Sequence, residues 1–597
     1  MKRFSPHVAA VVFAALVFAT ISWAHALPRP KEEWIELRTA NFTLFSSAGE
    51  KDTRRLATDL ERLRDALTQL SPGLALQSPY PTYIFVFKNA DSFRPYQRLY
   101  NGKPLDSGGY FLSRELANYV AIDGDQHGDE RAIVYHEYLH YVLRNNYSSL
   151  PLWLNEGMAE YYSTFEVGET EARIGKPIPE HVLWLRRNPL IPFTTLFAVD
   201  QDSPEYNEKS RRGAFYSQSW ALVHYLLSGS PERRRQASEY LRLAHNQGGE
   251  SPAAIFQKAF GTDPAVLERE LKTYVQSYLF NYTRAPIRPE ANFTMEARPL
   301  PRADLLFRLG DLLANLGDDH RAAAEEHFKA ALAAQPEHGP ATAGIGFLRE
   351  MGNRPAEAHP FYEKAAKLAP EDFLVQYLYA RSLLEAEGAD GLRQARAAFA
   401  KVVALRPDFG EGWARLGYTY QAEQELTAEA VQALETAHRL LPSRTDVAHN
   451  LAIAYARTGQ RQKAEDLIAK VLIPQGKPEM VENAREALLD EDHSRAEDLI
   501  GESKLVEALA ILEKTRAKTK SDIRRQNLTQ RIDEVRRVLS YNQFVDRFNE
   551  AVALANRGDV KGAAAILEPL AETTEDPNQA QKAKDLLSRL RPPKNPL

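Results

Sequence analysis

Prolines in the carboxyl-terminal half of the chain recur at a nearly constant spacing, and this spacing constrains the fold more than any other feature. They stand at positions 336, 370, 407, 442 and 474, so the intervals between them are 34, 37, 35 and 32 residues. Each proline closes a pair of segments in which apolar residues have helical spacing. Because one such pair cannot bury its apolar face alone, the sequence predicts a stack of helix pairs.

One copy of this repeat has a specific side-chain pattern. The residues that carry it are Trp413, Leu416, Gly417, Tyr420, Ala437 and Pro442. Their spacing resembles that of tetratricopeptide repeats, in which small residues let the two helices of a pair approach and large residues fill the gap between pairs. We therefore expect an all-α solenoid of tetratricopeptide repeats over residues 303–480 and further degenerate helical repeats over residues 481–597. An irregular helical bundle is the alternative.

The first 26 residues have the pattern of a secretory signal peptide. Lys2 and Arg3 precede a mostly apolar run at residues 8–21, and Ala-His-Ala at residues 24–26 offers the small residues of a cleavage site. We expect cleavage after Ala26 and no integral membrane segment in the mature chain. An uncleaved anchor is the alternative, but the run has 14 residues, whereas a bilayer-spanning helix needs about 20.

The chain contains no cysteine among its 597 residues. This excludes disulfides, thiolate metal sites, cysteine nucleophiles and an amino-terminal lipid attachment, so any metal ion must be bound by histidine and carboxylate. An exported protein of this size without disulfides fits a bacterial periplasm better than a eukaryotic secretory route. The net charge of -5, from 75 basic and 80 acidic residues, gives no electrostatic indication of nucleic-acid binding.

Residues 27–280 combine strand-like runs with helical segments. Four short apolar runs predict strands, at residues 34–37, 42–45, 83–87 and 119–122. Helical spacing predicts a helix over residues 53–70 and helices from residue 129 to about residue 279. A small mixed sheet followed by helices predicts an α+β domain. Four prolines without a sustained apolar period predict a linker over residues 281–302.

The α+β domain contains a His-Glu-x-x-His motif, formed by His136, Glu137 and His140 in a predicted helix. Four residues of α-helix turn through about 400° and rise about 6 Å, so both imidazoles project from one face and can bind one ion. Glu137 lies beside them and is positioned as a base rather than as a ligand. Given 15 histidines and 80 acidic residues, chance would produce such a motif roughly 0.05 times per chain. A helix with ordinary histidines is the alternative.

The next predicted helix offers acidic partners for the same ion. It follows Pro151, a residue suited to the first turn of a helix, and it contains Glu156 and Glu160. A catalytic zinc ion needs a third protein ligand and an open fourth position, and Glu156 is the acid best placed to be that ligand. Glu160 lies one turn further on the same face, where it can accept a hydrogen bond from a ligand imidazole. A solvated acidic face is the alternative.

The two motifs together, His-Glu-x-x-His and the downstream Trp-Leu-Asn-Glu-Gly-x-Ala-Glu-Tyr, resemble the gluzincin zinc peptidases and most of all the peptidase-MA-like group. The resemblance spans about 25 residues. It implies a gluzincin-like fold for residues 27–280. It also implies one Zn²⁺ ion bound by His136, His140 and Glu156, with Glu137 as general base and Glu160 behind a ligand histidine.

A third segment resembles the helix that presents a tyrosine to the transition state in several gluzincins, and Tyr216 is the corresponding residue. The resemblance implies that its phenol donates to the oxyanion of the tetrahedral intermediate, whereas simple aromatic packing is the alternative. His224, on the same apolar helix, is interpreted as a buried, hydrogen-bonded histidine rather than a further ligand. His127 is assigned no role. By the same resemblance, an extended substrate would lie along the segment at residues 110–122.

These observations predict an exported zinc metallopeptidase, a hydrolase in which the metal lowers the pKa of a water molecule and Glu137 takes its proton. The repeats would bind a protein substrate or a protein partner. The glycine-methionine-glutamate-asparagine motif of many zinc aminopeptidases is absent, which argues against that kind of exopeptidase. The alternative is a catalytically silent repeat scaffold, because a fold and a motif do not by themselves establish turnover.

Overall fold

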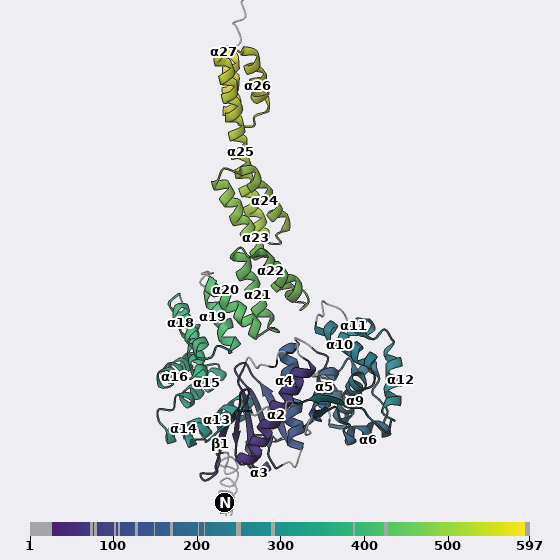
Figure 1. Cartoon of the computed structure of the whole chain (residues 1–597). Helices are drawn as coiled ribbons and strands as arrows, with labels where there is room; N and C mark the ends of the chain where they lie inside the picture. The colour runs from purple at the N-terminus through teal and green to yellow at the C-terminus, as the bar shows by residue number, and fades with distance from the viewer. Residues whose placement is uncertain are drawn as a thin grey trace, which may run out of the picture. The chain divides into compact units, whose positions relative to one another are not determined.

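The structure of the protein is a computed structural model (Figure 1). It describes residues 27–590 except 72–73, 75, 77–79, 101–102, 105–107, 126–128, 148–149, 168–170, 201, 208, 246–251, 288–292, 386–388 and 423–427. The predicted signal peptide, residues 1–26, therefore lies outside the described residues. Contacts along the chain define two compact units, one with residues up to Ala454 together with Ala469–Pro478, the other with Tyr455–Ile468 together with Glu479–Leu597.

A six-stranded mixed sheet lies in the first unit. Its strand order is β11-β1-β2-β3-β7-β6, in which β2, β3 and β7 run parallel and the other neighbours run antiparallel. The strands are β1 (Ile35–Arg38), β2 (Thr43–Ser46), β3 (Thr82–Phe87), β6 (Gly109–Ser113), β7 (Asn118–Asp123) and β11 (Glu296–Pro299). The four strands predicted from apolar runs correspond to β1, β2, β3 and β7, so these predictions are confirmed.

Helices form most of the remaining amino-terminal half. They are α2 (Glu50–Leu70), α3 (Ala90–Phe93), η1 (Arg94–Tyr96), α4 (Asp129–Asn146), α5 (Leu152–Ser163), α6 (Pro179–Arg187), α7 (Phe193–Leu196), α8 (Pro204–Asn207), α9 (Lys209–Ser228), α10 (Pro231–His245), α11 (Pro252–Phe260) and α12 (Pro264–Tyr274). Short strands complete this half: β4 (Leu99–Tyr100), β5 (Lys103–Pro104), β8 (Glu166–Val167), β9 (Glu171–Ile174) and β10 (Thr283–Pro286). The helix predicted at residues 53–70 corresponds to α2.

Both faces of the six-stranded sheet are buried, and alternate residues of each strand point to opposite faces. On β3, Ile84 and Val86 pack in a cluster with α2 and α4, which lie side by side in Figure 1. Phe85 and Phe87 of the same strand pack in a second cluster on the other face. Strands of a sheet that is covered on both faces are apolar at every position, which explains why β3 is a continuous apolar run.

The segment predicted as a linker, residues 281–302, contains two strands. β10 pairs antiparallel with β9, and β11 pairs antiparallel with β1. Just beyond β11, the Leu300 N–H donates a hydrogen bond to the carbonyl oxygen of Trp34 at 2.8 Å. Each strand has only four residues and ends in a proline, a composition that sheet edges tolerate but that gives no alternating apolar pattern. Strands β10 and β11 of the segment are therefore built into the sheets of the domain.

The carboxyl-terminal part of the first unit consists of helices that pack in successive pairs. They are α13 (Arg302–Leu316), η2 (Asp318–His320), α14 (Arg321–Ala334), α15 (Gly339–Met351), α16 (Pro355–Leu368), α17 (Phe373–Leu383), α18 (Ala389–Leu405), α19 (Gly410–Ala422), α20 (Ala428–Leu440) and α21 (Thr445–Arg457). Helix α13 packs on α14, α15 on α16, α17 on α18 and α19 on α20. A Cβ atom on Gly417 would lie 2.5 Å from Leu434 Cδ2, so this glycine permits the close approach of α19 and α20.

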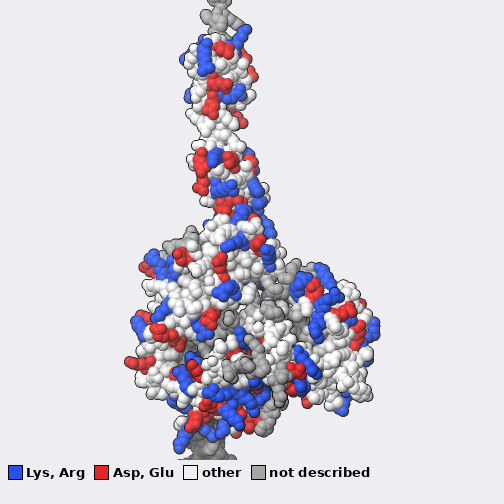
Figure 2. Space-filling model, in the orientation of Figure 1, with Lys and Arg blue, Asp and Glu red and all other residues white. Residues whose placement is uncertain are grey.

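The second unit is also helical. Its elements are α22 (Arg461–Leu467), α23 (Pro478–Gly501), α24 (Leu505–Lys518), α25 (Asp522–Asn556), α26 (Val560–Thr573) and α27 (Pro577–Leu590), whereas the π-helix η3 (Ile468–Leu472) belongs to the first unit from Ala469 onwards. Helix α24 packs on α25, α25 on α26 and α26 on α27. Within the described ranges, none of the helices of either unit is long and apolar enough to cross a membrane. On the face shown in Figure 2, both basic and acidic side chains occur over each unit.

Candidate metal centre

Helices α4 and α5 carry the five residues that the motifs single out. Helix α5 begins after Pro151, whose carbonyl oxygen accepts hydrogen bonds from the amides of Leu154 and Asn155 at 3.0 Å each. Its position is set by contact with α9, because a Cβ atom on Gly157 would lie 2.4 Å from the backbone oxygen of Ser219. Only glycine allows this approach, which places the neighbouring Glu156 against α4.

Three side-chain atoms converge between these helices. The Nε2 atoms of His136 and His140 lie 3.0 Å apart, and Glu156 Oε2 lies 3.5 Å from the first and 3.3 Å from the second. A tetrahedral ion with zinc–ligand bonds of about 2.0–2.1 Å holds its ligand atoms about 3.3–3.4 Å apart. The spacing of the three atoms therefore fits one zinc ion, and this is the only group of metal-binding geometry found among the residues that the structure describes.

Among the described residues, the two histidine rings are the polar partners of the buried atom Glu156 Oε2. Its separations from the two Nε2 atoms are ion-pair distances, and it accepts no hydrogen bond from any described residue. Two imidazoles and one carboxylate are also the donor set that zinc takes in catalytic sites. Buried acceptors without a hydrogen bond are rare in folded proteins, so the donor set and the position of this oxygen beside two imidazoles both fit a bound cation.

The electrostatics of the site favour positive charge beside the rings. Burial lowers the pKa of His136, but the interaction with Glu156 and the charges of Glu160 and Glu137 outweigh burial and raise it to about 9. Burial raises the pKa of Glu156, but His136 and His140 outweigh burial and hold that pKa well below its usual range. The site thus stabilises a cation between the two helices, whether a proton or a metal ion.

Glu160 lies behind His136, on the side away from Glu156. Its Oε1 atom is 3.6 Å from His136 Nδ1, which is an ion-pair distance rather than a hydrogen bond. Its Oε2 atom is 3.4 Å from His181 Nε2, and His181 Nδ1 is 2.9 Å from Ser217 Oγ. The interaction with His181 holds the pKa of Glu160 below its usual value despite burial. Sequence reasoning found Glu160 but missed His181, which lies on α6 outside any motif.

Tyr216 lies beside the His136 ring, and a second tyrosine packs on it. The rings of Tyr216 and His136 are stacked with centroids 6.4 Å apart. Tyr206, which sequence reasoning missed, stacks on Tyr216 at 6.2 Å and donates a hydrogen bond to Glu156 Oε1 at 3.1 Å. Burial and the charge of Glu156 raise the pKa of Tyr216 and raise that of Tyr206 to about 12. Both phenols therefore stay protonated at neutral pH and can act as hydrogen-bond donors.

Glu137 is half-buried beside the first ligand candidate. Its carboxylate forms no hydrogen bond or ion pair with another residue in the described part of the chain.

His224 lies apart from this group and has both ring nitrogens in hydrogen-bond contacts. Its Nδ1 atom lies 2.8 Å from the hydroxyl of Tyr274, and its Nε2 atom lies 2.7 Å from the carbonyl oxygen of Gly175. This confirms that it is a buried, hydrogen-bonded histidine. His127 lies outside the described residues.

Strand β6 lies next to the helix that carries the two histidines. It is the last strand of the sheet order and pairs with β7 on one side, whereas β7 lies between β6 and β3. Phe111 of β6 contacts Tyr141 of α4, with ring centroids 6.5 Å apart. Of the segment at residues 110–122, only β6 is thus a sheet edge beside α4.

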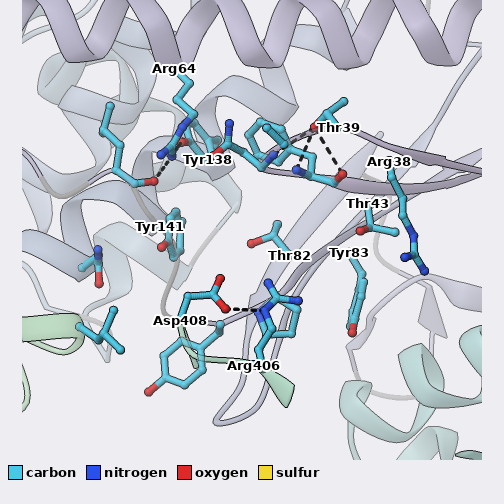
Figure 3. Close-up of a pocket in the computed structure, with 18 of the residues that line it drawn as sticks. Arg38, Thr39, Thr43, Arg64, Thr82, Tyr83, Tyr138, Tyr141, Arg406 and Asp408 are labelled. Carbon is cyan, nitrogen blue, oxygen red and sulfur yellow. Dashed lines mark hydrogen bonds and ion pairs between the residues drawn. The ribbon is translucent and has the colours of Figure 1, made fainter. Parts of the chain in front are cut away.

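A cavity of about 820 Å³ lies between the amino-terminal domain and the repeats. Figure 3 shows part of its lining, including Arg64, Tyr138 and Tyr141 from α2 and α4, and Arg406 and Asp408 from the turn after α18. The Arg64 guanidinium donates to the Tyr138 hydroxyl at 3.3 Å, and Arg406 pairs with Asp408 at 2.6 Å. The three candidate metal ligands do not line this cavity, so it is separate from the metal centre.

Several solved structures of repeat proteins are similar to part of this chain. YrrB, described as a tetratricopeptide-repeat protein with an unusual peptide-binding site, is 20% identical, with 31% of this chain and 92% of that chain covered and a TM-score of 0.27. TTC0263 of Thermus thermophilus, a tetratricopeptide-repeat protein, is 20% identical over 31% of this chain and 99% of that chain, with a TM-score of 0.24. A tetratricopeptide-repeat protein of Parabacteroides merdae is 15% identical over 48% and 98%, with a TM-score of 0.26.

The three proteins are described as tetratricopeptide-repeat proteins, the class predicted for residues 303–480. No protein-family model and no curated protein matches the chain. The gluzincin class of the amino-terminal domain, its zinc ion and the roles of its residues therefore stay predictions.

Proposed function

We propose that the protein is a zinc-dependent metallopeptidase whose single Zn²⁺ ion is bound by His136, His140 and Glu156. The observation that carries this proposal is the convergence of the two Nε2 atoms and the buried Glu156 Oε2 atom at spacings of 3.0–3.5 Å. A bound Zn²⁺ would supply a Lewis acid that polarises the scissile carbonyl and acidifies a water molecule.

The chain's own residues would move the protons and hold the geometry. Glu137, whose carboxylate has no competing partner among the described residues, would accept a proton from the attacking water and pass it to the leaving amine. Tyr216 would donate its phenolic proton as a hydrogen bond to the carbonyl oxygen as negative charge develops there. Glu160 would orient the His136 ring from behind. An extended peptide would align along the edge strand β6 beside α4.

We also propose that the protein is exported and that its repeats bind a protein. The leader-like first 26 residues and the absence of cysteine favour export to a bacterial periplasm. The substrate would be a protein or peptide. The helix pairs, with the large surface of a solenoid, favour a protein partner through the repeats.

Replacement of Glu137 by glutamine tests the chemistry. The variant removes the base but keeps the size of the side chain, so we expect one bound zinc per chain and a loss of peptide hydrolysis of about 10²-fold or more. Glu232→Gln on α10 is the matched control, because Glu232 is exposed and lies outside the metal centre. Metal analysis and hydrolysis of an unstructured protein substrate give the result. Hydrolysis by Glu137→Gln at the rate of the control would refute the proposed mechanism.

A second candidate function is a catalytically silent repeat scaffold. It is favoured by the share of the chain that consists of stacked helix pairs, from α13 onwards. Metal analysis after purification without chelators separates the two candidates in part, because protein without zinc would support the scaffold. One bound zinc without hydrolysis of any unstructured protein would indicate a silent or highly selective site.

A further inference from the structure

The turn between β6 and β7 is bound by the helices of the repeats. The Arg114 guanidinium donates two hydrogen bonds to the carbonyl oxygen of Asn315, from Nε at 2.9 Å and from Nη2 at 2.7 Å. Asn315 lies in the last turn of α13, where carbonyl oxygens lack intrahelical partners and the helix end is negative. Arg114 therefore satisfies a group that the helix itself leaves free.

The next residue of the turn is recognised by two arginines of the repeats. Glu115 lies 3.1 Å from Arg415 on α19 and 3.6 Å from Arg381 on α17. Both arginines are also held from within the repeats, since Arg415 pairs with Glu411 at 2.9 Å and Arg381 with Glu350 at 2.6 Å. Preorganised cations lose less side-chain entropy when they bind an anion, so this face is a built receptor for an acidic side chain.

Buried contacts extend the same interface into β7. The Tyr119 hydroxyl donates to Asp311 Oδ2 at 2.9 Å and accepts a hydrogen bond from the Asn315 side-chain amide at 3.0 Å. Ala117 is fully packed in the cluster that contains α13, and Leu116 packs against the cluster around Tyr377. Apolar burial and charge pairing thus act on one hairpin, which is the pattern of a specific docking interaction.

We propose that the inner side of α13, α17 and α19 is an internal docking site whose ligand is the chain's own β6–β7 hairpin, and that this docking holds β6 against α4. The link to the metal centre is the contact of Phe111 with Tyr141, the residue after His140. The consequence for catalysis rests on the proposed function, in which β6 is the strand that aligns the peptide. An outside partner that binds the same arginines would have to displace Glu115 and would release β6.

A charge reversal at the hairpin turn tests the docking. Glu115→Arg replaces attraction with repulsion at Arg381 and Arg415 and alters none of the residues through which β6 pairs with β7. Asp91→Arg is the matched control, because Asp91 is 81% exposed and pairs only with Arg94 among the ion pairs of the described residues. Hydrogen–deuterium exchange on the full-length chain should show amides of residues 109–113 exchanging about tenfold faster in Glu115→Arg than in the control. Amides of β1 and β2 should stay unchanged.

A second variant keeps the test decisive if the charge reversal prevents folding. Tyr119→Phe keeps the buried ring and removes only the hydroxyl that joins Asp311 and Asn315, and it should also increase exchange in β6. Unchanged amide exchange in β6 of a folded variant would overturn the docking. An equal increase in the exchange rates of β1 and β2 would also overturn it, because it would indicate a general loss of stability.

Catalytic measurements separate this inference from the proposed function. Glu115→Arg should keep one bound zinc and raise KM severalfold, because the strand that aligns the peptide is loosened. Faster β6 exchange with unchanged KM and kcat would leave the docking intact and overturn its link to the site. Failure of the Glu137→Gln test would remove the proposed function, whereas the exchange experiment does not depend on hydrolysis.

Discussion

The contact between α5 and α9 at Gly157 gives the sharpest test of how the metal centre is positioned. In Gly157→Ala the new Cβ atom would lie 2.4 Å from the Ser219 oxygen and 2.6 Å from Val223 Cγ2. A carbon–oxygen contact relaxes to about 3.3 Å, so the helices must separate by about 0.9 Å at this point. Overpacking of this kind lowers the free energy of unfolding by about 1–3 kcal/mol. The better helix propensity of alanine offsets up to about 1 kcal/mol of this loss.

The displacement also acts on the ligand next to the glycine. Metal–ligand distances tolerate deviations of about 0.2 Å, so a shift of α5 by several tenths of an ångström moves Glu156 out of bonding range of an ion held by His136 and His140. We expect the zinc affinity of Gly157→Ala to fall by about tenfold to a hundredfold, the range seen when groups that support metal ligands are lost.

Gly213 on α9 provides the control. Nothing lies within 4 Å of a Cβ atom built on it, so Gly213→Ala should be neutral or should stabilise the chain by up to about 1 kcal/mol. Denaturant unfolding followed by tryptophan fluorescence and zinc titration by calorimetry measure both variants. Gly157→Ala with the stability and zinc affinity of Gly213→Ala would refute the reasoning that this glycine positions Glu156.

Two further predictions concern single hydrogen-bonded groups. Tyr206→Phe removes the hydrogen bond to Glu156 Oε1 and should weaken zinc binding about tenfold in a competitive titration, whereas an unchanged affinity would show that Tyr206 does not orient this ligand. Burial lowers the pKa of His224 to about 4, below its unfolded value of about 6.5, so the unfolded chain binds more protons between these values. Stability should therefore fall by up to about 3 kcal/mol as the pH is lowered from 6.5 to 4, and His224→Gln should remove that part of the pH dependence in denaturant titrations.

The elements that could be predicted from sequence are those with a local signal. Strand β3 is a run of six buried residues, and Trp413 to Pro442 has repeat spacing, so both were predicted. Strands β10 and β11 were missed because each has four residues and a terminal proline. They pair with β9 and β1, which lie more than 100 residues away in the sequence. The local pattern of apolar residues does not indicate a partner at that distance.

The residues of the candidate site also fall into two groups, those with a local sequence signal and those without one. His136 and His140 share a helix face because of their spacing alone, and Glu156 follows on the next helix, so local geometry was sufficient for these three. His181 and Tyr206 reach the site only because α6 and α8 pack against α9. A single histidine or tyrosine on a short helix has no distinguishing pattern, and tertiary packing decides which of them faces a ligand.

The packing of the sheet also shows that the first repeat shares a hydrophobic core with the domain that carries the candidate metal ligands. Phe45, Tyr83 and Phe85 form the face of the sheet opposite α4, and they are covered by Leu305 and Leu309 of α13. Leucines at this spacing on α13 therefore complete a core that begins in β2 and β3. Because α4 packs on one face of that sheet and α13 on the other, the sheet that supports the two histidines is fully buried only when the first repeat is in place. The sequence boundary at residue 302 separates two patterns of residues, while the hydrophobic core extends across it.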